Sequence, residues 1–148
     1  MNKLISFVLM VIIGTSPVLS QNKEYDYSDK YIPRKYISDL SKPTLVMLTA
    51  TWCGPCKYMK ENIMKLPEVR QCLDSLNVLI IDVDVEGKYL KDKFSDVGYT
   101  GAIPYFALLD PQGNYTDHIT GRKDEEKFLT FIRKSLSKAN NNGENEKN

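Results

Sequence analysis

Runs of apolar residues alternate with amphipathic stretches along the chain, a pattern that predicts strands separated by helices. The apolar runs over 43–49 and 78–85 are typical of strands buried on both faces of a sheet. A third run covers 105–109, and the turn at 110–113, with Pro at its second position and Gly at its fourth, predicts a β-hairpin that returns over 114–119. These runs provide the strands of a single sheet.

Helical periodicity fills the gaps between the strands. Residues 56–64 favour a helix, Pro67 begins a second short helix, and 87–94 predicts a third. The last helix is predicted over 124–136, with acids in its first turn and bases at its end, as the helix dipole prefers. Residues 138–148 are almost free of apolar side chains and predict a disordered tail.

This order of elements predicts an α/β fold. Strands separated by helices lie parallel, and the hairpin adds an antiparallel edge, so we expect a central mixed sheet of four to five strands with helices on both faces. This arrangement is a three-layer sandwich. We expect it to occupy residues 41–137, after a polar, Tyr-rich segment over 21–40 for which no firm structure is predicted.

Composition limits the class of protein. The 148 residues suffice for one domain, and 42% of them are hydrophobic, enough for a buried core. Basic and acidic side chains number 20 and 19, which argues against nucleic-acid binding because such proteins carry a basic excess. Three cysteines are too few for a miniprotein stapled by disulfides.

The first twenty residues have the three-part layout of a secretory signal peptide. Lys3 precedes an apolar run over 4–13, and residues 14–17 break that run before a predicted cleavage after Ser20. The run is about ten residues long, whereas a helix that spans a bilayer needs about twenty, so a retained membrane anchor is the weaker alternative. We expect residues 1–20 to be removed and the protein to be exported, to a periplasm.

Cys53 and Cys56 carry the sharpest chemical signal. They are spaced Cys-x-x-Cys where a predicted buried strand turns into a helix. The start of a helix stabilises negative charge, so Cys53 should be favoured as a thiolate, while Cys56 lies one turn inside and is shielded. This asymmetry predicts that Cys53 attacks a substrate disulfide and that Cys56 then releases the reduced substrate.

Three other interpretations of the pair stay open. A structural disulfide is one, although a ring this short contributes only about 2 kcal/mol through chain entropy. A zinc site needs four ligands, and the remaining candidates, Cys72 and His118, are not placed near the pair by anything in the sequence; we expect no metal. The third is an inert pair on a fold kept for binding. Cys72 itself lies on an apolar stripe and is predicted to be a small buried side chain.

The motif Trp52-Cys53-Gly54-Pro55-Cys56 resembles the active site of thioredoxins. Further along, Ile103-Pro104 opens a strand as the family's cis-proline does, and Gly121 before the last helix also fits the pattern. The helix interrupted at Pro67 and the strand with Asp82 and Asp84 look like exported members, among them the C-terminal domain of DsbD-type interchange reductases. The resemblance covers roughly residues 40–137.

The resemblance implies a thioredoxin-like sandwich with catalytic Cys53 and Cys56 and no small-molecule cofactor. It implies an active-site shell of Trp52, Gly54, Pro55, Ile103 and Pro104. The Ile103–Pro104 bond should be cis and lie against Cys53, so that the Ile103 backbone can pair with an extended substrate. The pair Gly54-Pro55 is that of thioredoxin itself, which indicates a reductant; an oxidant or isomerase is the alternative.

Two departures from the family affect proton transfer. Thioredoxins carry a buried Asp six residues before the first cysteine, where this chain has Met47, and the usual Lys partner is replaced by Ile80. We therefore expect the proton of the second cysteine to leave through water, Glu61, Asp82 or Asp84, or to a base that the partner supplies.

The expected partners follow from the compartment. Substrates would be exported proteins that carry disulfides, because disulfides persist outside the cytosol. An oxidising compartment supplies no reductant, so a membrane electron donor should recharge the pair. We expect the protein itself to be a monomer and not to bind nucleic acid.

Overall fold

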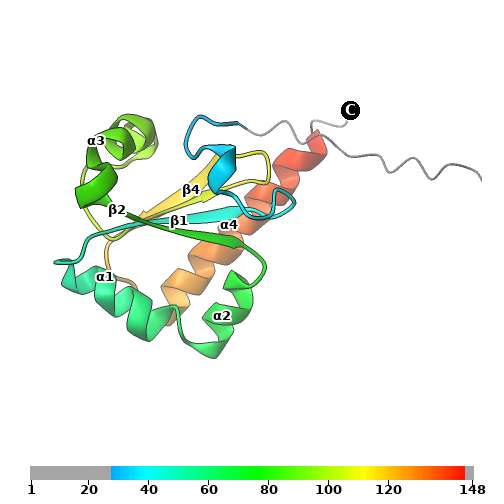
Figure 1. Ribbon diagram of the computed structural model, residues 1–148. Helices are drawn as coiled ribbons and strands as arrows, with labels where there is room; N and C mark the ends of the chain where they lie inside the picture. The colour runs from blue at the N-terminus through cyan, green and yellow to red at the C-terminus, as the bar shows by residue number, and fades with distance from the viewer. Residues whose placement is uncertain (1–27, 146–148) are drawn as a thin grey trace, which may run out of the picture.

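The computed structural model describes residues 28–145, and the expected signal peptide over 1–20 lies outside them (Figure 1). Four strands form one sheet in the order β2-β1-β3-β4. They are β1 (Thr44–Thr49), β2 (Asn77–Asp82), β3 (Tyr105–Leu109) and β4 (Tyr115–Thr120). Strand β1 runs parallel to β2 and antiparallel to β3, which pairs antiparallel with β4, so the predicted mixed sheet is confirmed.

Helices cover both faces of this sheet. The α-helices are α1 (Gly54–Tyr58), α2 (Pro67–Leu73), α3 (Val83–Phe94) and α4 (Glu125–Asn145). The 3-10 turns are η1 (Arg34–Tyr36) and η3 (Ser95–Val97), and the π-helical turn η2 (Met59–Ile63) continues α1. Figure 1 shows α1, α2 and α4 on one side of the sheet and α3 on the other, which confirms the three-layer sandwich. Within the described residues, no helix is both long enough and apolar enough to cross a bilayer.

The sheet separates two hydrophobic cores. Leu45 and Met47 of β1 pack with Phe128 of α4 in the first core, which also contains both cysteines of the motif. Val46 and Leu48 point the other way and pack with side chains of α3 and β3 in the second core. Strand β1 is therefore buried on both faces, as its apolar run predicts.

The second strand differs from its prediction in length and burial. It ends at Asp82, because the Asp82 carboxylate accepts a hydrogen bond from the Asp84 N–H (2.8 Å) and caps α3, which begins at Val83 rather than at 87. It also lies at the edge of the sheet, where Val78 and Ile80 are 39% and 48% exposed. The prediction of a strand buried on both faces is wrong here, since an apolar run alone does not reveal an edge position.

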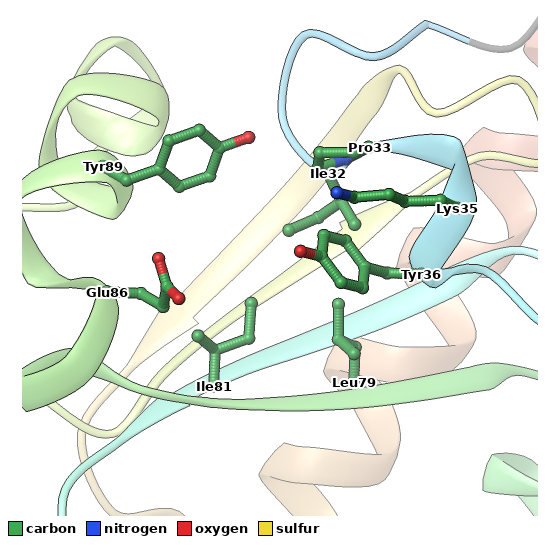
Figure 2. Close-up of a pocket in the computed structure, with 8 residues that line it drawn as sticks. All are labelled: Ile32, Pro33, Lys35, Tyr36, Leu79, Ile81, Glu86 and Tyr89. Atoms are coloured by element: carbon green, nitrogen blue, oxygen red, sulfur yellow. The ribbon is translucent and has the colours of Figure 1, made fainter.

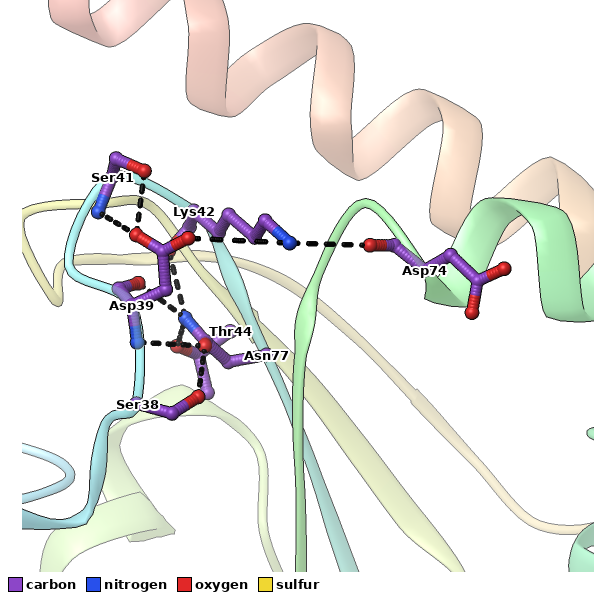
Figure 3. Close-up of polar contacts among 7 residues, drawn as sticks. All are labelled: Ser38, Asp39, Ser41, Lys42, Thr44, Asp74 and Asn77. Carbon is purple, nitrogen blue, oxygen red and sulfur yellow. Dashed lines mark hydrogen bonds and ion pairs between the residues drawn. The ribbon is translucent and has the colours of Figure 1, made fainter.

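The packed unit begins earlier than the expected boundary at 41. Tyr31 and Ile32, within the Tyr-rich segment, are buried in the second core, where Tyr31 lies 5.4 Å from Phe94 between ring centroids. Asn77 then fastens the segment to the start of β2 (Figure 3). Its side chain accepts from the Asp39 N–H and donates to the Asp39 carbonyl, at 3.2 and 2.7 Å.

The predicted disordered tail over 138–148 is wrong for residues 138–145. Helix α4 continues to Asn145, and Ala139 is buried in the first core. Lys138 donates to the Asp117 carboxylate of β4 at 2.6 Å. The helix therefore gains tertiary contacts that its polar composition does not indicate.

The Asp117–Lys138 contact predicts a pH effect on stability. Partial burial opposes ionisation of Asp117, but the hydrogen bonds from Lys138 and the His118 N–H outweigh it and lower its pKa below the ordinary 3.8. A carboxyl whose pKa is lower in the folded chain stabilises it above that ordinary value, and the contribution is lost as pH falls through the folded pKa. We expect Lys138→Met to cost under about 1 kcal/mol at neutral pH and less at pH 3.

Urea unfolding at pH 7 and pH 3 measures this difference. Lys91→Met, on an exposed position of α3, is the matched control and should shift both values equally. An equal loss at both pH values for Lys138→Met would show that the contact contributes through packing and not through charge.

Candidate active site

Cys53 and Cys56 lie at the corner where β1 passes into α1. The Cys53 N–H donates to the Ala50 carbonyl at 3.2 Å, which closes a tight turn after the strand. Cys53 is the N-cap of α1, and Pro55 lies in the first turn of the helix, where its missing N–H removes no helical hydrogen bond. The strand, the turn and the helix together fix the position of both sulfurs.

The two cysteines form a disulfide in the structure. The sulfurs are 2.03 Å apart and the Cα atoms 5.2 Å apart. Cys53 is 4% exposed and Cys56 is fully buried. A thiol from outside the protein therefore reaches the disulfide at Cys53. Cys56 has no exposed surface, so it can react only with a sulfur that is already inside the site.

The sulfur of Cys53 accepts a hydrogen bond from a backbone N–H. The Cys56 N–H donates to Cys53 Sγ at 3.2 Å, and the Lys57 N–H donates to the Cys53 carbonyl at 3.1 Å. Pro55 has no N–H to offer. The site can thus stabilise a negative charge on Cys53, with one N–H from the described residues directed at it.

Trp52 and Asp84 form one rim of the site. The Trp52 side chain is 69% exposed, and its indole N–H donates to the Asp84 carboxylate at 2.8 Å. Asp84 belongs to the first turn of α3, so this contact joins the motif loop to the opposite face of the sheet. The sequence marked Asp84 only as a proton-transfer candidate and gave no signal for its bond to the indole.

Pro104 immediately precedes β3. The Ile103–Pro104 peptide bond is cis, the isomer that the resemblance implies, and Pro104 is buried. The Pro104 carbonyl accepts from the Gly121 N–H at 2.7 Å, and Gly121 has a φ of +81°, a backbone conformation that favours glycine. Ile103 packs against the core cluster that contains Cys53 and Cys56.

Met47 and Ile80, which replace the buried Asp and its Lys partner of thioredoxins, have no ionisable side chain. Met47 is fully buried and stands in register with Ile80, on the sheet face that the cysteines share. Glu61 is exposed on η2, while Asp82 caps α3. The structure therefore does not bring the three predicted carboxylates together around Cys56.

Thr49 is a buried polar residue near the motif in sequence that the sequence analysis did not single out. It is buried at the end of β1, and its hydroxyl forms no hydrogen bond with another described residue. It pairs in register with Asp82, so both side chains point to the same face as Met47. Its place four residues before Cys53 is the only signal the sequence offers.

A second missed contact joins α1 to the loop before α4. The Arg122 guanidinium lies 3.5 Å from the centroid of the Tyr58 ring, a cation–π contact. The Lys123 N–H donates to Met59 Sδ at 3.3 Å. These contacts hold the Gly121 loop against α1, which carries Cys56, and against the first residue of η2.

Metal ligands do not gather in the described part of the chain. No group of three or more His, Cys, Asp or Glu side chains is close enough there to hold an ion. Cys72 is a free, half-buried thiol on α2, and His118 lies half-buried in β4 with its Nδ1 2.7 Å from the Tyr115 hydroxyl. Cys72 and His118, the two further ligands that a zinc site would need, therefore lie on different elements and form no metal-binding group with the cysteine pair.

Comparison with known proteins identifies relatives of this chain. The family model described as Thioredoxin matches residues 29–134. The chain is 32% identical over 91 residues to the chloroplastic thioredoxin-like protein HCF164 of Oryza sativa subsp. japonica, covering 62% of this chain and 33% of that protein. It is 29% identical over 97 residues to the thiol:disulfide interchange protein DsbD of Cronobacter sakazakii, covering 64% and 17%. The match spans a third or less of each relative.

Solved structures show the same fold. A thioredoxin from Thermus thermophilus superposes with a TM-score of 0.60 at 21% identity, covering 69% of this chain and 79% of that one. The oxidised C-terminal domain of DsbD from Neisseria meningitidis gives 0.55 at 24% identity, covering 65% and 82%. At 21–24% identity these superpositions show a shared fold only.

The Trp52–Asp84 hydrogen bond predicts an optical effect, since Trp52 is the single tryptophan of the chain. We expect Asp84→Ala to free the indole and lower its fluorescence anisotropy. Asp84→Asn, which keeps an acceptor oxygen, should retain it. Asp92→Ala on the same helix is the control. Equal anisotropy in Asp84→Ala and the unmodified chain would show that packing alone orients the indole.

Proposed function

This chain belongs to the thioredoxin family, and we propose that it is an exported thiol-disulfide oxidoreductase that reduces disulfide bonds of other exported proteins. The observation that supports this role best is the cysteine pair itself. Cys53 stands at the start of a helical segment, accepts one backbone N–H and is the more accessible sulfur, while Cys56 is fully buried behind it.

The reaction is a dithiol–disulfide exchange. In the reduced protein the Cys53 thiolate attacks one sulfur of the substrate disulfide; a bond forms to that sulfur, the substrate S–S bond breaks, and the other substrate sulfur leaves as a thiolate that takes a proton. Cys56 then loses its proton and attacks Cys53 Sγ. The mixed disulfide breaks, the second substrate thiol leaves, and two electrons have passed from the protein to the substrate.

The direction of exchange follows from how strongly the Cys53 thiolate is stabilised. Strong oxidants near −120 mV stabilise the reduced form far more than thioredoxin does near −270 mV. Here one N–H reaches Cys53 Sγ, Pro55 offers none, and Gly54 adds no cation. Such moderate stabilisation favours a reductant over the alternative oxidant or isomerase.

Substrate would bind beside Cys53, between Trp52 and Pro104. We propose that the Ile103 backbone pairs with an extended substrate segment beside Cys53, and that the exposed Trp52 ring covers the apolar part of that segment. Gly54, Pro55 and Pro104 shape the remaining surface around the sulfurs. No small-molecule cofactor enters this reaction.

Of the candidate proton acceptors, we favour Asp82. Asp84 and Glu61 are both exposed, whereas Asp82 is partly buried at the end of β2. Oδ1 of Asp82 caps α3, and no described residue binds its Oδ2. By strand alternation the side chain points to the sheet face that carries the cysteines, and it stands in register with Thr49, whose hydroxyl has no hydrogen-bond partner among the described residues. Thr49 and a water molecule would complete the path from Cys56.

The compartment and electron source belong to the same proposal. The signal-like first twenty residues support export, to a periplasm, and one relative is a thiol:disulfide interchange protein. A membrane electron donor would return the oxidised pair to the dithiol form. The protein would act as a monomer on disulfide-bearing exported proteins.

Insulin reduction in the presence of dithiothreitol tests the redox role. We expect Cys53→Ser to lower the rate above the dithiothreitol background at least 100-fold, because no sulfur then reaches the substrate. Cys72→Ala, which removes the half-buried free thiol of α2, is the matched control and should stay within about twofold. Equal rates for Cys53→Ser and the unmodified chain would exclude the redox role and favour a non-catalytic binding protein. A reduction potential near −120 mV would instead reverse the direction.

The Asp82 proposal predicts a slower second step. In a stopped-flow measurement, Asp82→Asn should slow release of substrate from the Cys53 mixed disulfide about 100-fold near neutral pH, the low end of what a positioned proton-transfer group contributes. Formation of the mixed disulfide should be unchanged. Glu61→Gln is the control. An unchanged release rate and pH profile for Asp82→Asn would exclude this role.

A further inference from the structure

The outer edge of β2 has unpaired backbone groups. Strand β2 forms one edge of the sheet, and the Asn77 N–H donates inward to the Pro43 carbonyl at 2.8 Å. Because backbone groups alternate along a strand, the N–H and C=O of Val78 and Ile80 point away from β1. Within residues 28–145, no strand pairs with this edge.

This edge also lacks the usual protection against strand pairing. Edge strands are commonly guarded by charged side chains, proline or bulges, yet β2 carries no charge before Asp82, and Val78 and Ile80 are substantially exposed. The opposite edge differs, since Asp117 of β4 is charged and is paired with Lys138. The two edges of one sheet are thus unequal.

A pocket of about 400 Å³ lies over β2 on the face opposite to the cysteines. Figure 2 shows Leu79 and Ile81 of β2 as its floor, with η1 on one side and α3 on the other. The lining residues are Ile32, Pro33, Lys35, Tyr36, Leu79, Ile81, Glu86 and Tyr89. An apolar floor with a few polar groups at the rim is typical of a binding site.

The rim carries two opposite charges. Lys35 stands on the η1 side and Glu86 on the α3 side (Figure 2), and neither forms an ion pair with another described residue. The rings of Tyr36 and Tyr89 line the space between them. A ligand that fits this rim would carry an acid and a base on either side of an apolar group.

We propose that the β2 edge and this pocket bind an extended segment of a partner protein by strand addition. The segment would pair with the backbone of Val78 and Ile80 and place a large apolar side chain in the pocket. Side chains two residues apart share a face, so an acid and a base at those positions would reach Lys35 and Glu86. The required pattern is acid-x-apolar-x-base, in either direction.

A partner segment fits better than a second copy of this chain. Strand β2 of another copy would present Asn77, Leu79 and Ile81 on the face of the pocket, and none of these side chains is charged. The β2 strand of a second copy would thus offer no charged side chain to Lys35 or Glu86. The inference goes beyond the redox role and does not depend on it, because the pocket and the cysteines lie on opposite faces of the sheet.

Titration of the isotope-labelled full chain with a capped peptide, Thr-Asp-Val-Phe-Val-Lys-Thr, and with its reversed sequence tests the proposal by NMR. We expect saturable shifts at Val78–Ile81 with at least one of the two, and slower solvent exchange of the Val78 and Ile80 amides. A peptide N-methylated at alternate residues should not bind. Tyr89→Ser and Lys35→Glu should each weaken binding about tenfold. Val85→Ser, an exposed position of α3 outside this pocket, is the matched control.

Each other outcome overturns the proposal in a distinct way. Equal binding of the N-methylated peptide would indicate a pocket ligand without strand pairing. Shifts confined to residues near Cys53 would indicate that the peptide binds as a redox substrate and not at β2. The absence of any saturable shift would show that this peptide pattern does not bind to the β2 edge. Sedimentation of the unmodified chain as a dimer that Ile80→Lys dissociates would assign the edge to a second copy. Insulin reduction by Tyr89→Ser separates these results from the redox role, because its rate should be unchanged.

Discussion

Burial of β1 on both faces is the constraint on which the rest of this structure depends. All six of its residues are buried, and it is the strand that pairs with both β2 and β3. Each large apolar side chain buried there contributes about 1.5–3 kcal/mol, which fixes the strand and therefore the point where it ends. The turn after β1 sets Cys53 at the start of α1. The position of the reactive sulfur is thus a result of core packing.

That position makes the two sulfurs chemically unequal. Cys53 receives a backbone N–H and retains slight access to solvent, while Cys56 is closed off by the first core. A thiolate is favoured where an N–H group points at it, and the proline of the motif limits how many can do so. The hydrogen bond from Trp52 to Asp84 joins the motif loop to α3, and the contact of Arg122 with Tyr58 joins α1 to the loop before α4.

Sequence patterns predicted the order of elements, the mixed sheet and the cysteine motif, because each depends on local periodicity or spacing. The exposed edge at Val78 and Ile80 was not predictable in this way, since it depends on which strand lies next to β2. The helical continuation past Lys138 depends on Asp117, a residue distant in sequence. Burial of Tyr31 likewise depends on Phe94, and the indole contact of Asp84 on the turn that brings α3 beside the motif. Each of these features depends on residues that are distant in sequence, so no local pattern of residue types predicts it.

The division of the interior into two cores has a consequence for how this sequence can diverge. Side chains in separate layers, without shared neighbours, change stability nearly additively. In the described part of the chain, Val83 and Ile103 are the partly buried side chains that pack against both cores, so substitutions around Phe94 and Tyr31 should have little effect on the packing of Met47 or Cys56. A variant of the second core can therefore change the stability of the chain while the geometry around the two sulfurs is kept.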